Sequence, residues 1–93
     1  MLARMCRNIR PLFNFDPPAT DEEVHAAALQ FVRKVSGTTK PSTANQAVFD
    51  EAVHDITHVV RRLIDELVTT APPKDREVEA AKARERAAVR YAR

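Results

Sequence analysis

The clearest pattern in the chain is a row of apolar residues that recur at alternating spacings of four and three, the period of one helix face. The row consists of Phe49, Val53, Ile56, Val60, Leu63 and Leu67. Four more apolar residues flank it on both sides, namely Val48, Ala52, Val59 and Ile64. The pattern predicts a long helix whose apolar face is too wide for one neighbouring helix. We expect an N-terminal arm and a second helix to share this face, or a second copy of the chain to cover the remainder.

A shorter helix is predicted over residues 20–36. Thr20 and Glu23 have the spacing of a capping box, and Gly37, the only glycine, is placed to end the helix in the left-handed conformation. Its apolar stripe runs through Val24, Ala28, Phe31 and Val35. The long helix is expected over about 42–70, with Ser42 or Thr43 as its cap, Gln46 completing a box from Thr43, and Pro72 and Pro73 stopping it.

Both ends of the chain differ from this centre. Residues 5–18 predict an extended arm, because prolines at positions 11, 17 and 18 disfavour helix, and the arm's apolar side chains are expected to lie across the helices. Residues 75–93 are rich in alanine and charge and predict a third helix. The expected fold is therefore all-α: a helical hairpin with an N-terminal arm, forming a domain over 1–73, followed by a charged helical tail over 74–93.

Composition narrows the class of protein. The chain has 93 residues and a single cysteine, which excludes an internal disulfide. No apolar stretch approaches the roughly 20 residues that span a bilayer, and no secretory segment opens the chain. These features predict a soluble, cytoplasmic protein that does not enter a membrane.

The charge of +2 is unevenly distributed. Residues 1–16 carry three arginines against one acid, and residues 74–93 carry seven basic residues against four acids. Residues 17–73 carry eight acids against five basic residues. Basic ends on an acidic middle make RNA or ribonucleoprotein binding through the arms an alternative function.

Three residues form a weak candidate metal site. Asp50, His54 and His58 are spaced four apart, so they share one helix face opposite the apolar row, and two histidines at this spacing can chelate a metal. The stretch from His54 to His58 also resembles the zinc-protease motif H-E-x-x-H. Asp55 is shorter than the glutamate of that motif, and no third ligand follows. We predict neither a metal nor another cofactor.

Cys6 is a candidate for thiol chemistry. If translation begins at Met5, aminopeptidase trimming leaves Cys6 as the terminal residue, and Arg7 favours its reactive thiolate form. A thiol-dependent activity is therefore the second alternative function.

Several strings of the sequence resemble a family of short bacterial proteins of unknown function. They include Met5-Cys6-Arg7-Asn8-Ile9, Leu12-Phe13-Asn14-Phe15, Pro17-Pro18-Ala19-Thr20 and Lys40-Pro41-Ser42. The resemblance covers about residues 5–70 and implies no activity, substrate or cofactor.

The opening string has a feature that the fold does not require, because a helical core needs no Cys-Arg-Asn at its edge. Cys6, Arg7, Asn8 and Arg10 are therefore the candidate binding residues. The leading hypothesis is a non-enzymatic interaction or scaffold protein that binds a partner protein or self-associates.

Overall fold

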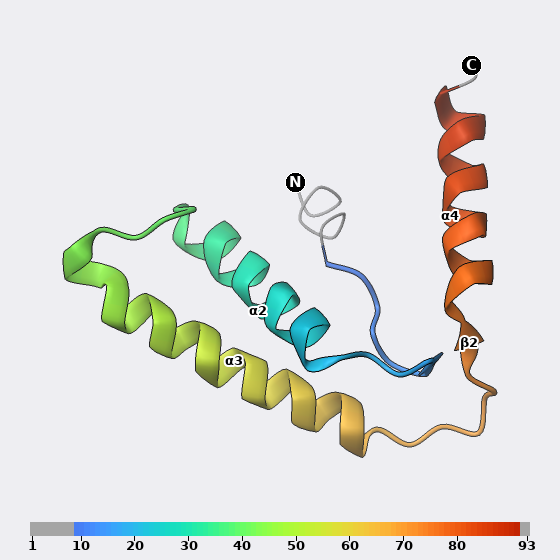
Figure 1. Cartoon of the computed structure of the whole chain (residues 1–93), viewed down its shortest axis with the longest axis horizontal. Helices are drawn as coiled ribbons and strands as arrows, with labels where there is room; N and C mark the ends of the chain where they lie inside the picture. The colour runs from blue at the N-terminus through green and yellow to red at the C-terminus, as the bar shows by residue number, and fades with distance from the viewer. Residues whose placement is uncertain (1–8, 92–93) are drawn as a thin grey trace.

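A computed structural model describes residues 9–91 and shows the predicted all-α fold (Figure 1). Helices α2 (Asp21–Ser36) and α3 (Gln46–Glu66) run antiparallel and pack along one another as a hairpin. The short 3₁₀-helix η1 (Thr43–Asn45) leads into α3, and the third helix is α4 (Arg76–Tyr91). Two-residue strands β1 (Phe15–Asp16) and β2 (Lys74–Asp75) pair in parallel. Across the described residues, no helix combines the length and apolar character needed to cross a membrane.

Both ends of α2 form as the sequence predicts. The Thr20 hydroxyl accepts a hydrogen bond from the Glu23 backbone N–H at 3.2 Å, and the Glu23 carboxylate accepts one from the Thr20 N–H at 2.9 Å. Gly37 takes φ 73° and donates its N–H to the carbonyl of Arg33 at 3.0 Å. The capping box and the left-handed glycine therefore set the length of α2.

The start of α3 differs from the prediction. Neither Ser42 nor Asn45 makes a side-chain cap, and the Gln46 amide donates instead to Asp50 Oδ1 at 2.9 Å. The expected box from Thr43 to Gln46 is therefore wrong. Thr43 lies inside the 3₁₀-helix and not at the cap of α3, and Gln46 lies one α-helical turn before Asp50, whose carboxylate it binds.

The end of α3 also comes earlier than the predicted residue 70. Leu67 is already extended, and the Thr69 hydroxyl accepts the backbone N–H of Ala71 at 3.1 Å. This local bond competes with helical pairing in a stretch of β-branched residues. The Asn14 amide, at φ 64°, then binds the carbonyls of Ala71 and Pro72 at 3.3 and 3.2 Å. The chain therefore leaves the helix to reach β1, where Lys74 N–H donates to the Asn14 carbonyl at 2.8 Å.

The core lies between the two hairpin helices. Val32 of α2 packs with Phe49 and Val53 of α3, and partly buried Leu29, Ala52 and Ile56 surround them. The arm adds half-buried side chains from Ile9, Leu12, Phe13 and Phe15, as predicted. The N-terminal half of the α3 apolar row is therefore buried, whereas Leu63 and Leu67 at its C-terminal end remain exposed.

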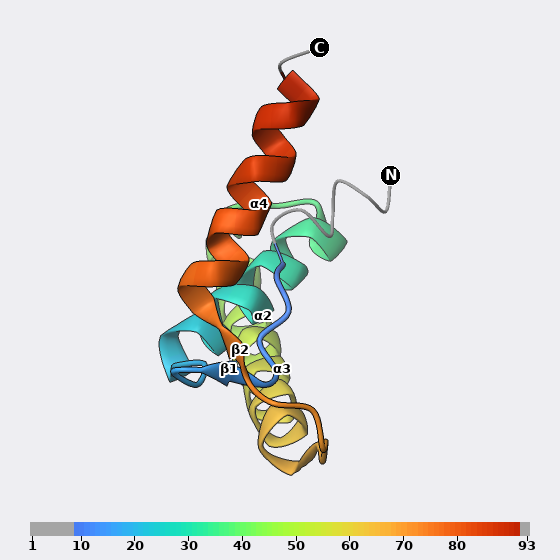
Figure 2. The ribbon, with the colours of Figure 1, turned by 90° about the vertical axis from the view of Figure 1, so that its right-hand side faces the viewer.

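Helix α4 does not pack along α2 or α3 in the described part of the chain (Figure 1). It continues directly from β2, whose pairing with β1 holds its first residue beside the arm (Figure 2). The tail is thus tied to the hairpin at one end only.

Candidate functional site

An apolar groove lies where the arm crosses the hairpin. Its volume is about 410 Å³, and the arm, α2 and α3 all contribute to its wall. It is lined by Ile9, Arg10, Leu12, Phe13, Ala27, Ala28, Phe31, Ile56, Val60, Leu63, Ile64 and Leu67. With Arg10 as the one charged residue of this lining, the groove suits an apolar ligand surface and offers little for polar chemistry.

The groove is left open because the arm covers only part of the wide apolar face. Phe31 on α2 is 42% exposed, and Leu67, just after α3, is 45% exposed. The three prolines of the arm hold it extended, so it contributes a single layer of side chains instead of a packed helix. An extended segment is too narrow to cover the whole apolar face of the hairpin.

A second hollow of about 730 Å³ lies at the turn of the hairpin. Its lining mixes apolar residues with hydroxyl and amide side chains: Val32, Ser36, Thr38, Lys40, Pro41, Ser42, Asn45, Val48, Phe49 and Ala52. Some polar groups of this loop already bond to one another: Thr38 Oγ1 donates to the Lys40 carbonyl at 3.1 Å.

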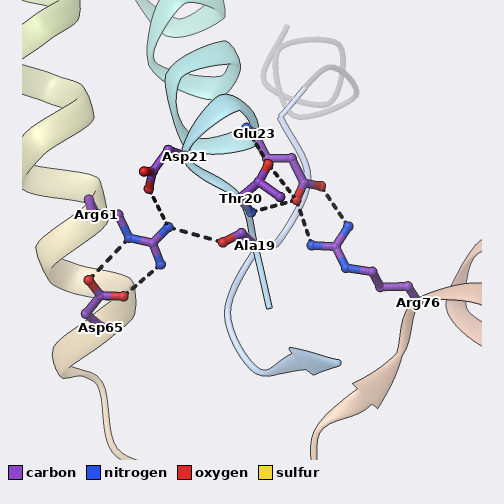
Figure 3. A network of polar contacts seen from close by, with 7 residues as sticks. All are labelled: Ala19, Thr20, Asp21, Glu23, Arg61, Asp65 and Arg76. Atoms are coloured by element: carbon purple, nitrogen blue, oxygen red, sulfur yellow. Dashed lines mark hydrogen bonds and ion pairs between the residues drawn. The ribbon is translucent and has the colours of Figure 1, made fainter. Parts of the chain in front are cut away.

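Two arginines tie the base of the hairpin together, as Figure 3 shows. Arg76 Nη1 and Nη2 donate to Glu23 Oε2 and Oε1 at 2.8 and 2.7 Å, and Arg76 Nε donates to the Pro17 carbonyl at 2.6 Å. Glu23 therefore serves the α2 cap and the α4 anchor with one carboxylate. The hydrogen bonds from Arg76, then those from Thr20, lower the pKa of Glu23 from 4.5 to about 2.

Arg61 makes the matching connection from α3. Its guanidinium pairs with Asp65 at 2.7 and 3.2 Å, donates to the Ala19 carbonyl at 3.1 Å and meets Asp21 at 3.3 Å. The hydrogen bonds with Asp65, followed by those with Asp21, raise the pKa of Arg61. This network fixes the start of α2 against α3 (Figure 3). Because each of its charges is satisfied within the chain, we interpret it as structural.

The residues predicted as sites are only partly described. Cys6, Arg7 and Asn8 lie outside the described residues. Arg10 is exposed and lies at the rim of the groove, so it stays a candidate binding residue.

The weak metal candidates Asp50, His54 and His58 are exposed on α3. No group of three or more histidine, cysteine, aspartate or glutamate side chains arranged to hold a metal is found among residues 9–91.

Sequence reasoning missed Arg61 and Arg76 as anchors, and Asn14 as a clamp. Their partners lie 40 or more residues away in the chain, so no local spacing announces the contact. A weak signal existed for Asn14, because asparagine tolerates the left-handed conformation better than most residues.

Fold and site define a small helical-hairpin protein with an open apolar surface and a salt-bridged base. The chain belongs to the uncharacterized conserved protein family DUF2277, whose model matches residues 5–82. The match runs past residue 70, where the resemblance in sequence was expected to end, and includes the start of α4. No curated protein and no solved structure matches the chain.

Proposed function

We propose that the protein is a non-enzymatic interaction protein that docks a protein partner on the apolar surface of its hairpin. One observation carries this proposal: large apolar side chains of both α2 and α3 stay exposed beside a groove with a mainly apolar wall. Contiguous apolar surface of this kind costs solubility in a free monomer and marks interaction sites. The salt-bridged base supports the role because it holds the two helices at a fixed spacing.

The test compares two substitutions that add the same charge. Phe31→Glu places a carboxylate in the groove, and His54→Glu places one on the exposed polar side of α3. Tagged wild-type, Phe31→Glu and His54→Glu proteins are purified from the native cell together with untagged chain, and circular dichroism checks that each variant is folded.

We expect wild type and His54→Glu to retain the same stoichiometric protein, either another protein or the untagged chain, and Phe31→Glu to lose it. Binding is then repeated with the two purified components. Full retention by a folded Phe31→Glu protein would refute docking at the groove.

The two alternatives have their own readouts in the same purification. RNA binding through the basic ends predicts nucleic acid that elutes as salt rises. Two cations of the basic tail are already paired within the fold, Arg76 with Glu23 at 2.7 Å and Lys82 with Glu79 at 3.4 Å, which makes this proposal the weaker one. Thiol chemistry at Cys6 predicts alkylation by iodoacetamide faster than for a peptide thiol.

A further inference from the structure

Helix α3 carries an apolar stripe along one flank of its core face, where Ala52 packs against the core cluster and Leu63 lines the groove. Val48, Ala52, Val59 and Leu63 are spaced four, seven and four apart, which places them within an arc of about 60° at 100° per residue. Val48, Val59 and Leu63 are 63, 64 and 54% exposed. The stripe therefore presents three exposed apolar side chains along one flank of α3.

A charged row runs directly beside this stripe. It consists of Glu51, Asp55, His58 and Arg62, spaced four, three and four apart and all exposed. The row is acidic at the N-terminal end of α3 and basic at Arg62. The sign of the charge therefore changes from one end of the row to the other. A helix that packs beside the row meets matching or opposing charges depending on its direction.

The stripe and the charged row of one α3 helix match those of a second α3 helix that runs in the opposite direction. If Val48 lies opposite Leu63 of a second copy, Ala52 falls opposite Val59, and the twofold axis repeats both pairs. The same flank of each helix then faces its counterpart across the axis, as in antiparallel coiled coils. Glu51 comes beside Arg62 of the second copy, whose guanidinium also pairs with Glu66 of its own chain at 3.1 Å, and Asp55 comes beside His58.

A parallel arrangement gives the opposite result. It puts the charged row of one helix beside the opposite flank of the other helix, which carries Phe49, Ile56 and Val60, so Glu51 and Asp55 gain no basic partner. The charge pattern therefore selects the antiparallel pairing of two α3 helices.

We propose that the partner on this stripe is a second copy of the chain, in a symmetric dimer whose α3 helices pack antiparallel with Val48 opposite Leu63. The proposal rests on the proposed function and adds to it the identity of a partner and the register of the contact. It also explains how a 93-residue chain with a small core gains stability.

Cysteine cross-linking tests the register. Val48→Cys and Leu63→Cys are each made in a Cys6→Ser background, since both side chains are exposed and tolerate the change. Under mild oxidation, we expect neither variant alone to form a disulfide-linked dimer and an equimolar mixture to form one. Dimers from each variant alone would indicate parallel helices and overturn the proposal, and so would a mixture that forms none.

Charge exchange supplies a second readout that does not depend on oxidation. We expect Glu51→Arg to weaken the dimer roughly tenfold, because the axis repeats the lost pair, and Arg62→Glu in the same chain to restore it. Failure of the double variant to recover would contradict the register. If the wild-type chain does not dimerise while Phe31→Glu still loses a different partner, the dimer fails and the proposed function stands.

Discussion

At the scale of single residues, the Glu23 side chain joins two parts of the structure, the cap of α2 and the anchor of α4. The sequence predicted its role in the capping box, because the residues involved lie three positions apart. Its bidentate pair with Arg76 was not predictable, since 53 residues separate the two and only the folded chain brings them together. The Glu23 carboxylate thus takes part in both the local capping box and the long-range pair with Arg76.

The lowered pKa of Glu23 predicts a pH dependence of stability. Because the folded-state pKa is about 2 and the ordinary value is 4.5, ionised Glu23 stabilises the fold above pH 4.5, and this contribution is lost as the pH falls toward 2. We expect Glu23→Gln to lower the melting temperature by several degrees at pH 7 and by progressively less below pH 4.5. Thermal unfolding followed by circular dichroism from pH 7 to pH 3 measures this.

Glu22→Gln is the matched control, because the neighbouring carboxylate is exposed. A gap between wild type and Glu23→Gln that stays constant down to pH 3 would show that ionisation of Glu23 is not the source of the stabilisation.

At the scale of elements, the apolar period predicted the two hairpin helices and missed the connection after α3. The helix was expected to run to about residue 70, but α3 ends at Glu66, and Thr69 and Asn14 bind backbone groups of Ala71 and Pro72. The two-residue strands were not predicted either, because no alternating pattern can show in two residues. The contacts that hold α4 in place therefore join residues far apart in the chain and could not be predicted from local sequence patterns.

We expect Arg76→Ala to release α4 from the hairpin while α2 and α3 stay folded. The substitution removes the bonds to Glu23 and to the Pro17 carbonyl, so the ladder between β1 and β2 remains as the main joint. Hydrogen exchange followed by mass spectrometry should then show faster exchange in residues 74–91 and little change in the core around Val53.

Arg84→Ala is the control for a lost arginine, since Arg84 is exposed in the middle of the same helix. Equal acceleration in both variants would show that α4 depends on its own helix propensity and not on the anchor at Arg76.

At the scale of the whole molecule, the width of the apolar face proved the most informative part of the sequence. It left two ways to cover α3 open, by α2 with the arm or by a second copy of the chain, and the structure shows α2 packed along α3 and the arm lining a groove with it. Val48 and Val59 remain exposed, so α2 and the arm leave part of this face uncovered. The candidate site was less predictable, because a groove depends on the path of the arm, which no period in the sequence specifies.

Two neighbouring residues of α3 separate folding from association. Ile56 packs against the core cluster, so Ile56→Asp is expected to unfold the hairpin by leaving a charge unpaired among apolar side chains. Val59 is 64% exposed three residues later, so Val59→Asp should keep the fold and lose only the contact with a partner. Circular dichroism of the two variants establishes this difference before association is measured.

Sedimentation velocity of wild-type and Val59→Asp chains over a range of concentrations tests the central claim, that the exposed stripe of α3 is a contact between two copies. We expect wild type to approach twice the chain mass of 10.5 kDa as concentration rises. Val59→Asp, folded, should remain at the mass of one chain, with a dissociation constant raised on the order of 100-fold. A wild-type protein that stays monomeric at every concentration, or a Val59→Asp dimer as tight as wild type, would contradict the account.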